Sequence, residues 1–201
     1  MSGVIRTGRQ RVRVLMSLRA LPSPVARFFW RAHRHAGRAG DSFSLSSAAR
    51  PAELAELLAL ARGRSSVVEL GTGTAWTAIA LAIDDPGRRV ITCDPCARQE
   101  REAYLTLAGP SVRRRIELRQ EPDTHGPRQD DAPVGMLFVD SLHEREAVTA
   151  AFHAWRAALE PGAVVAFHDY GHPDYPGVRE SITDLGLAGE ESGGLFVWRA
   201  P

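Results

Sequence analysis

The segment VVELGTGTAW, residues 67–76, joins an apolar run to two closely spaced glycines. The run resembles the end of a buried β-strand, and Gly71 and Gly73 follow it directly. At the carboxyl edge of a parallel sheet, glycines let a ligand approach the backbone N–H groups where the next helix begins. The segment therefore predicts the first strand of a ligand-binding α/β sheet.

Strands and helices alternate along the rest of the chain. We expect strands at 66–70, 89–93, 115–119, 134–139, 163–167, 187–191 and 194–199. We expect helices at 24–36, from Ser47 or Pro51 to 61, and at 75–83, 96–107, 144–159 and 178–185. Several of these strands are continuously apolar, which is typical of a parallel sheet covered on both faces. The pattern predicts an α/β, Rossmann-like doubly wound sheet, mostly parallel with an antiparallel C-terminal strand. Residues 122–133 predict a loop or a single turn where another crossover helix would be expected.

Charge is distributed unevenly along the chain. The first forty residues carry nine arginines and no acidic residue, whereas the remainder carries 16 arginines against 24 acids. Such an arm could bind nucleic acid or anionic lipid, or lie against its own domain or a second subunit. We favour the last option because no nucleic-acid motif accompanies the arm. An apolar helical face formed by Val25, Phe28, Phe29 and Ala32 suggests an amphipathic arm or lid and is consistent with a homodimer.

Targeting signals are not evident. Arginines interrupt any apolar core that a signal peptide would need, and no run approaches the roughly 20 apolar residues that cross a bilayer. We therefore expect a cytoplasmic protein without a membrane partner. Cys93 and Cys96 form a CDPC segment, which we interpret as a strand end and helix start rather than a redox or metal pair.

Residues near the glycine turn in the sequence restrict the class of ligand that it can bind. The dinucleotide fingerprint GxGxxG requires a third glycine where this chain has Trp76, which argues against NAD. Asp94 lies about 20 residues beyond the glycines, a position from which an acid can accept hydrogen bonds from both ribose hydroxyls of an adenosine. Asp94 could also cap the following helix with Pro95 in its first position, and the two roles can coexist.

A second group of polar residues follows strands four and five. Asp140 ends the fourth predicted strand, and His168 and Asp169 end the fifth. If these strands are neighbours, the three side chains converge, and two carboxylates with an imidazole suit a divalent ion. They could instead cap a helix or bond to backbone or cofactor.

His143, three residues after Asp140, is a candidate general base because an unperturbed histidine has a pKa of about 6.5. It could equally be a residue of the helix start that bonds to Glu144 or Glu146.

The chain resembles the class I S-adenosylmethionine (SAM) dependent methyltransferases. The likeness covers about residues 45–200 and rests on VVELGTGTA, VITCDP, LFVDSLHE and LEPGAVVAFHDY in that order, followed by PGVRESITDL. It is strongest to the small-molecule O-methyltransferases with HDY after the fifth strand, such as the catechol and macrolide-sugar types. We therefore expect basic arm or lid helices over residues 1–45 and a SAM-dependent methyltransferase domain over residues 46–201.

The resemblance implies roles for individual residues. The amino-acid end of SAM would contact Glu69, Gly71, Thr72 and Gly73, the ribose would contact Asp94, and Gln120 and Glu121 would lie near the adenine. Asp140 would take part in cofactor binding and catalysis, and His143 stands where the catechol-type enzymes carry a lysine thought to act as base. This chain contains no lysine.

Asp140, His168 and Asp169 would be the metal ligands by the same resemblance. The family's pair after strand five contains two acids or an acid and an amide, so His168 departs from the pattern. That departure leaves Mg²⁺, Mn²⁺, Zn²⁺ or no metal as alternatives.

The resulting hypothesis is a SAM-dependent enzyme that O-methylates a small hydroxylated metabolite. The alternatives are a metal-independent O- or N-methyltransferase and a catalytically inactive SAM-binding scaffold. Methylation of nucleic acid is disfavoured because the chain has no DPPY or NPPY motif. The acceptor itself is not encoded in any recognisable pattern.

Overall fold

The computed structural model describes residues 18–201. The arginines at 6, 9, 11 and 13 of the predicted basic arm lie outside the described residues. Within residues 18–201, no helix combines the length and the apolar character that a membrane crossing requires.

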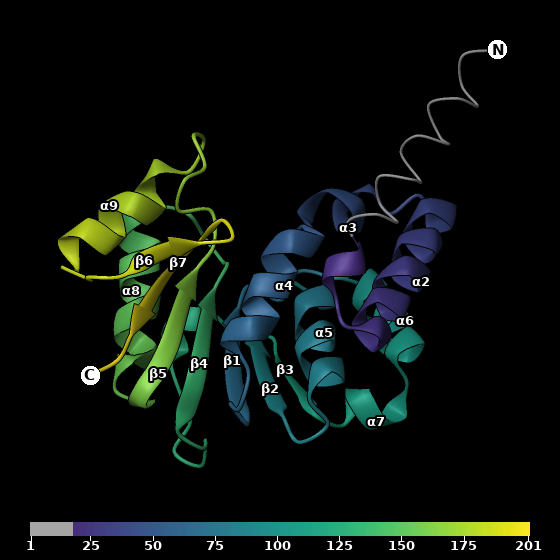
Figure 1. Ribbon diagram of the computed structural model, residues 1–201, viewed down its shortest axis with the longest axis horizontal. Coiled ribbons are helices and arrows are strands. Elements are labelled where there is room, and N and C mark those ends of the chain that lie inside the picture. The colour runs from purple at the N-terminus through teal and green to yellow at the C-terminus, as the bar shows by residue number, and fades with distance from the viewer. Residues whose placement is uncertain (1–17) are drawn as a thin grey trace.

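A seven-stranded sheet in the order β3-β2-β1-β4-β5-β7-β6 forms the centre of the molecule (Figure 1). Its strands are β1 Ser66–Leu70, β2 Arg89–Cys93, β3 Ile116–Arg119, β4 Val134–Val139, β5 Leu159–Phe167, β6 Glu190–Ser192 and β7 Leu195–Arg199. Strands β1 to β5 pair in parallel, whereas β7 runs antiparallel to β5 and forms a hairpin with β6. The sheet confirms the predicted Rossmann-like class with its antiparallel C-terminal strand.

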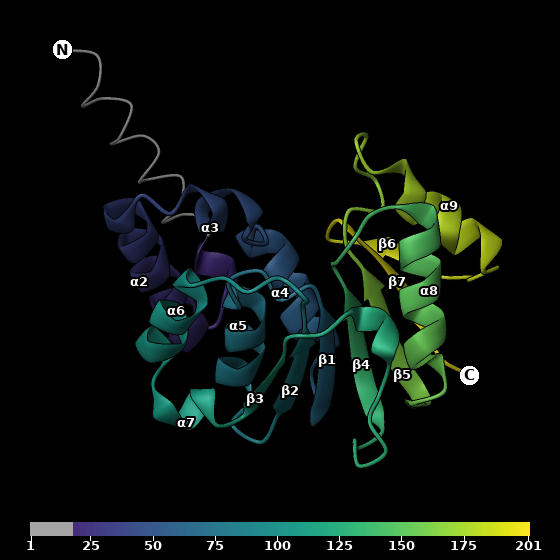
Figure 2. The same ribbon diagram turned by 180° about the vertical axis from the view of Figure 1, so that it is seen from behind.

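Helices cover both faces of the sheet (Figures 1 and 2). The helical segments are η1 Leu18–Ala20, α2 Ser23–Ala39, α3 Ser42–Ser47, α4 Pro51–Leu60, α5 Trp76–Asp84, α6 Glu100–Ala108, α7 Pro110–Arg113, η2 Asp123–His125, α8 Arg145–Arg156 and α9 Pro176–Asp184. Successive strand residues point to opposite faces, so Val67 joins the core under α4 and α5, and Val68 joins the core under α8. Both faces are therefore dry, which explains the continuously apolar strands.

Helix α2 confirms the helix predicted over residues 24–36 and extends it to Ala39. Its apolar side chains Val25, Phe28 and Phe29 are at most 4% exposed, and they pack in the same core as α5 and α6. The apolar face is thus used within the chain. It offers no surface to a second subunit, so the argument for a homodimer from this face is wrong, while docking on its own domain is confirmed for α2.

Helices α6 and α8 differ most clearly from their predicted boundaries. Helix α6 begins at Glu100 instead of near Cys96 because Asp94 Oδ1 accepts a hydrogen bond from the Cys96 N–H at 2.8 Å and forms a turn there. Asp94 is therefore not the cap of this helix. Helix α8 ends at Arg156, and β5 already begins at Leu159. The predicted loop at 122–133 holds only the single turn η2, as expected.

Candidate active site

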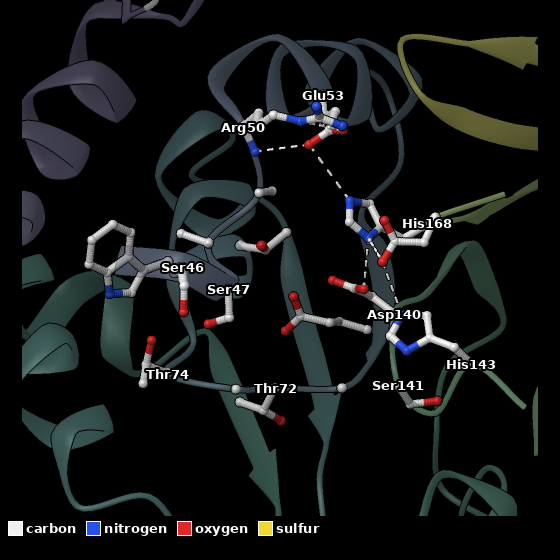
Figure 3. A pocket seen from close by; sticks show the side chains of 18 of the residues that line it. Ser46, Ser47, Arg50, Glu53, Thr72, Thr74, Asp140, Ser141, His143 and His168 are labelled. Carbon is white, nitrogen blue, oxygen red and sulfur yellow. Dashed lines mark hydrogen bonds and ion pairs between the residues drawn. The ribbon is translucent and has the colours of Figure 1, made fainter. Parts of the chain in front are cut away.

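A cavity of about 600 Å³ opens at the carboxyl edge of the sheet, where the loops after β1, β4 and β5 meet the segment from α3 to α4 (Figure 3). Of the residues predicted to form the site, those that line this cavity are Glu69, Gly71, Thr72, Gly73, Asp140, His143, His168 and Asp169. The structure thus brings the glycine turn and the residues after strands four and five to one hollow.

Gly71 is required by a close backbone contact. Its φ is +99°, and a Cβ atom added there would lie 2.0 Å from the carbonyl oxygen of Asp140. Gly73 has a φ of +49°, and its N–H donates to Asp94 Oδ2 at 2.9 Å. The turn after β1 is therefore tied to the ends of both neighbouring strands, β4 and β2.

Glu69 lies beneath the turn and is 2% exposed. Thr92 donates to Glu69 Oε2 at 2.6 Å, and the hydroxyl of Thr92 lies 2.7 Å from that of Thr72. Burial raises the pKa of Glu69 to about 8, against the opposing effect of the Thr92 hydrogen bond. The cavity floor therefore contains a carboxyl group that ionises only with difficulty in the absence of a cation.

Asp94, Gln120 and Glu121, the predicted ribose and adenine contacts, do not line the cavity. Both oxygens of Asp94 already have partners, because Oδ2 also lies 3.2 Å from the Arg101 guanidinium. Gln120 is exposed, and the carboxylate of Glu121 accepts hydrogen bonds from Arg128 at 3.3 Å.

The residues after β4 and β5 form a compact cluster at the opposite side of the turn. Asp140, His143, His168 and Asp169 each offer one donor atom, and these atoms all lie within 4.8 Å of one another. His168 Nδ1 lies 3.0 Å from Asp140 Oδ1 and 3.1 Å from Asp169 Oδ2, and His143 Nε2 lies 3.1 Å from Asp169 Oδ2. The predicted convergence of strands four and five is therefore present in the fold.

The charges in the cluster reinforce one another. Burial lowers the pKa of His168, but the carboxylates of Asp140, Asp169 and Glu53 outweigh burial and raise this pKa well above its usual value. Burial opposes ionisation of Asp169, yet the two histidines hold the pKa of its carboxyl far below its usual value. In the absence of a metal, the surrounding carboxylates therefore favour the protonated form of His168.

The donor set also fits a divalent cation. His143 Nε2 and both ring nitrogens of His168 are buried without a hydrogen bond of acceptable geometry, although carboxylate oxygens lie close to them. Ring nitrogens that face carboxylates in this way can share a cation. The mixture of nitrogen and oxygen donors suits Mn²⁺ or Zn²⁺ better than Mg²⁺, which prefers oxygen alone.

Several cavity residues were not predicted from the sequence. Among them are Glu53 and Arg50, at the start of α4, which lie across His168 from the cluster (Figure 3). No sequence signal singles out Glu53, because Glu56 in the same helix sequence PAELAELLAL does not line the cavity. Tyr175, in the loop after β5, stacks on His143 with ring centroids 4.1 Å apart. For Tyr175 the sequence allowed two interpretations, a residue that lines the acceptor pocket or an ordinary surface-loop residue, and in the structure Tyr175 lines the cavity.

Trp76 occupies the position of the missing third glycine. It is 3% exposed and makes edge-to-face contacts with Phe28, Phe29 and Tyr104, at centroid distances of 6.4, 5.4 and 5.1 Å. Helix α2 thus supplies the packing partner for a large side chain at the start of α5. This arrangement departs from the tight helix-to-strand contact that the third glycine allows in dinucleotide-binding sheets.

The fold and cavity define a class I SAM-dependent methyltransferase. The chain belongs to the methyltransferase domain family, whose sequence profile matches residues 68–170. This match confirms the class predicted from the sequence motifs. No curated protein sequence matches the chain.

Solved structures with similar folds include several O-methyltransferases. TomG from Streptomyces achromogenes, involved in tomaymycin synthesis and crystallised with SAM, is 22% identical, with a TM-score of 0.63 over 90% of this chain and 91% of that one. An O-methyltransferase from Bacillus cereus in complex with SAH is 15% identical, with a TM-score of 0.65 over 90% and 91%. A putative caffeoyl-CoA O-methyltransferase from Staphylococcus aureus is 14% identical, with a TM-score of 0.60 over 74% and 82%. At these identities the likeness shows a shared fold.

Proposed function

We propose that the protein transfers the methyl group of SAM to a hydroxyl oxygen of a small molecule, assisted by a divalent metal. The observation that carries this proposal is the position of the Asp140, His143, His168 and Asp169 cluster in the same cavity as the glycine turn. Similar folds in TomG, in synthesis of tomaymycin, and in a putative caffeoyl-CoA O-methyltransferase support an oxygen acceptor on a small molecule.

Glu69, Gly71, Thr72 and Gly73 hold the amino-acid end of SAM in this proposal. The ammonium group of that end would compensate the buried Glu69 carboxylate, whose pKa is raised to about 8 without a cation. Asp94 holds the ribose, with Gln120 and Glu121 near the adenine. Because Asp94 already contacts Gly73, Arg101 and Cys96, ribose binding requires exchange of at least one of these partners.

Asp140, His168 and Asp169 hold the metal. A bound divalent metal would orient the acceptor hydroxyl and lower its pKa. His143 takes the acceptor proton, and Asp169 orients its ring, as a base and its orienting carboxylate do in other active sites. Methyl transfer to an aligned oxygen then needs little more from the chain than holding the two reactants in line.

Activity with labelled SAM tests this proposal. We expect methyl transfer to one or more members of a panel of small hydroxylated acceptors, loss of that transfer on addition of a chelator, and recovery on addition of Mn²⁺. Transfer that resists the chelator would favour the metal-independent alternative. Absence of transfer to every acceptor, together with SAH binding, would favour the inactive scaffold.

A further inference from the structure

His168 contacts acidic groups on both sides of its ring. Nδ1 faces Asp140 and Asp169 in the cluster, whereas Nε2 faces Glu53 Oε2 at 3.7 Å (Figure 3). Glu53 belongs to α4, outside the sheet edge that supplies the other residues. The ring is therefore enclosed between the cluster and one carboxylate from a separate element.

Glu53 itself is firmly placed. Its Oε2 accepts from the backbone N–H of Arg50 at 2.9 Å, and its Oε1 accepts from Arg50 Nε at 2.9 Å, so that it closes the first turn of α4. The turn between β6 and β7 covers it, because a Cβ atom at Gly194 would lie 3.1 Å from Glu53 Oε1. Glu53 is only 6% exposed in consequence.

Capping the helix does not explain a buried charge at this position. A glutamine at the third position of a helix can make the same backbone contact without a charge. Burying a carboxylate is costly unless cations or proton donors face its oxygens. The largely exposed Arg50 guanidinium pairs with Oε1 of Glu53, whereas Oε2 is turned toward His168. The buried group that faces Glu53 is the imidazole of His168.

We propose that Glu53 is a positioning residue, which holds Nε2 of His168 so that Nδ1 points between Asp140 and Asp169. This inference rests on the metal of the proposed function. The partner of the second ring nitrogen fixes the orientation of a ligating histidine and increases its basicity. The 3.7 Å between His168 Nε2 and Glu53 Oε2 is within ion-pair range and exceeds a hydrogen bond.

Three variants separate positioning from capping. Glu53→Gln keeps a group that can close the first turn of α4 but removes the charge that faces His168. Glu53→Ala removes both. Glu56→Gln is the matched control, because Glu56 lies one turn further along α4, accepts from Ser192 Oγ at 2.7 Å and does not line the cavity.

Two readouts test the inference: the Mn²⁺ dissociation constant, measured from the electron paramagnetic resonance of free Mn²⁺, and the orientation of the His168 ring in metal-free crystals. We expect the dissociation constant to rise roughly 10- to 100-fold in Glu53→Gln and at least as much in Glu53→Ala. The ring should rotate away from position 53 in both variants. Glu56→Gln should match the wild type in both readouts, and SAH affinity should stay within threefold throughout.

Wild-type Mn²⁺ affinity and an unmoved His168 ring in Glu53→Gln would overturn the inference, whether or not Glu53→Ala folds. If the wild-type protein binds no Mn²⁺, the metal of the proposed function is contradicted. The ring orientation in Glu53→Gln then still decides the role of Glu53.

Discussion

His168 Nδ1 lies 3.0 Å from Asp140 Oδ1 and thereby joins the end of β5 to the end of β4. The backbone of Asp140 in turn packs against Gly71 so closely that a Cβ atom there would lie 2.0 Å from its carbonyl oxygen. The glycine turn and the acid and histidine cluster are therefore parts of one packed unit. A substitution in the glycine turn should therefore alter the geometry of the cluster, and a substitution in the cluster should alter the turn.

Gly71→Ala is expected to damage both stability and cofactor binding. The new Cβ atom would collide with the Asp140 carbonyl, and alanine rarely adopts a φ of +99°. We expect a loss of at least about 2 kcal/mol in the free energy of unfolding and a strongly weakened affinity for SAH. Chemical denaturation and calorimetry measure the two effects.

Gly37→Ala is the control for this substitution. Gly37 lies inside helix α2, and a Cβ atom there would meet no other atom within 4 Å. The stability of the Gly37→Ala variant should equal or exceed that of the wild type. A Gly71→Ala protein as stable as Gly37→Ala, with normal SAH affinity, would contradict the role given to this turn.

Asp140→Asn and Asp169→Asn should each abolish high-affinity Mn²⁺ binding. Each substitution removes a negatively charged oxygen donor from the cluster while keeping the volume of the side chain. Methyl transfer should fall together with metal binding. Asp174→Asn, in the exposed part of the loop after β5, should bind Mn²⁺ like the wild type. Equal Mn²⁺ affinity in all four proteins would exclude this cluster as the metal site.

His143→Gln should separate catalysis from metal binding. If His143 acts as the base, kcat should fall roughly 100-fold or more, while Mn²⁺ and SAH affinities stay within a few fold of the wild type. The measurement is steady-state kinetics combined with Mn²⁺ titration. If Mn²⁺ affinity falls as far as in Asp140→Asn, His143 is a metal ligand, and its assignment as base is wrong.

Glu69 should make the stability of the ligand-free protein depend on pH. Its carboxyl ionises at about pH 4.5 in the unfolded chain but only at about pH 8 in the folded one. The folded state therefore holds a proton that the unfolded state loses, and the free energy of unfolding falls as pH rises from 4.5 to 8. This shift in the pKa of Glu69 corresponds to a loss on the order of 5 kcal/mol in the free energy of unfolding.

Glu69→Gln tests this dependence because glutamine remains neutral and can still accept from Thr92. The stabilities of the two proteins, compared by denaturation at several pH values, should diverge between pH 5 and pH 8 in favour of the variant. A constant difference across this range would show that the carboxyl of Glu69 ionises normally.

The sheet could be predicted from the sequence, and so could the meeting of the residues that follow β4 and β5. Both depend on the order of the strands along the chain. The apolar runs around Val67, Leu137 and Val165 have both faces buried, and a residue directly after such a strand must lie at the carboxyl edge. The meeting of Asp140 with His168 follows from this rule once β4 and β5 are neighbours.

Contacts that depend on which of several available partners a side chain bonds to could not be predicted from the sequence. Asp94 forms a turn with Cys96 and also contacts Gly73 and Arg101. The turn with Cys96 moved the start of α6 beyond the predicted position. Glu53 reaches the site because of the position in which α4 packs against the sheet. Such placement is determined by the whole core and has no pattern of its own in the sequence.

Calorimetric titration of the purified 201-residue chain with SAH, with and without Mn²⁺, tests the central claim most directly. We predict binding in the micromolar range in both conditions and a separate Mn²⁺ binding signal that Asp140→Asn removes. A folded protein that takes up neither SAH nor Mn²⁺ would contradict the assignment of this cavity as a metal-assisted methyl-transfer site.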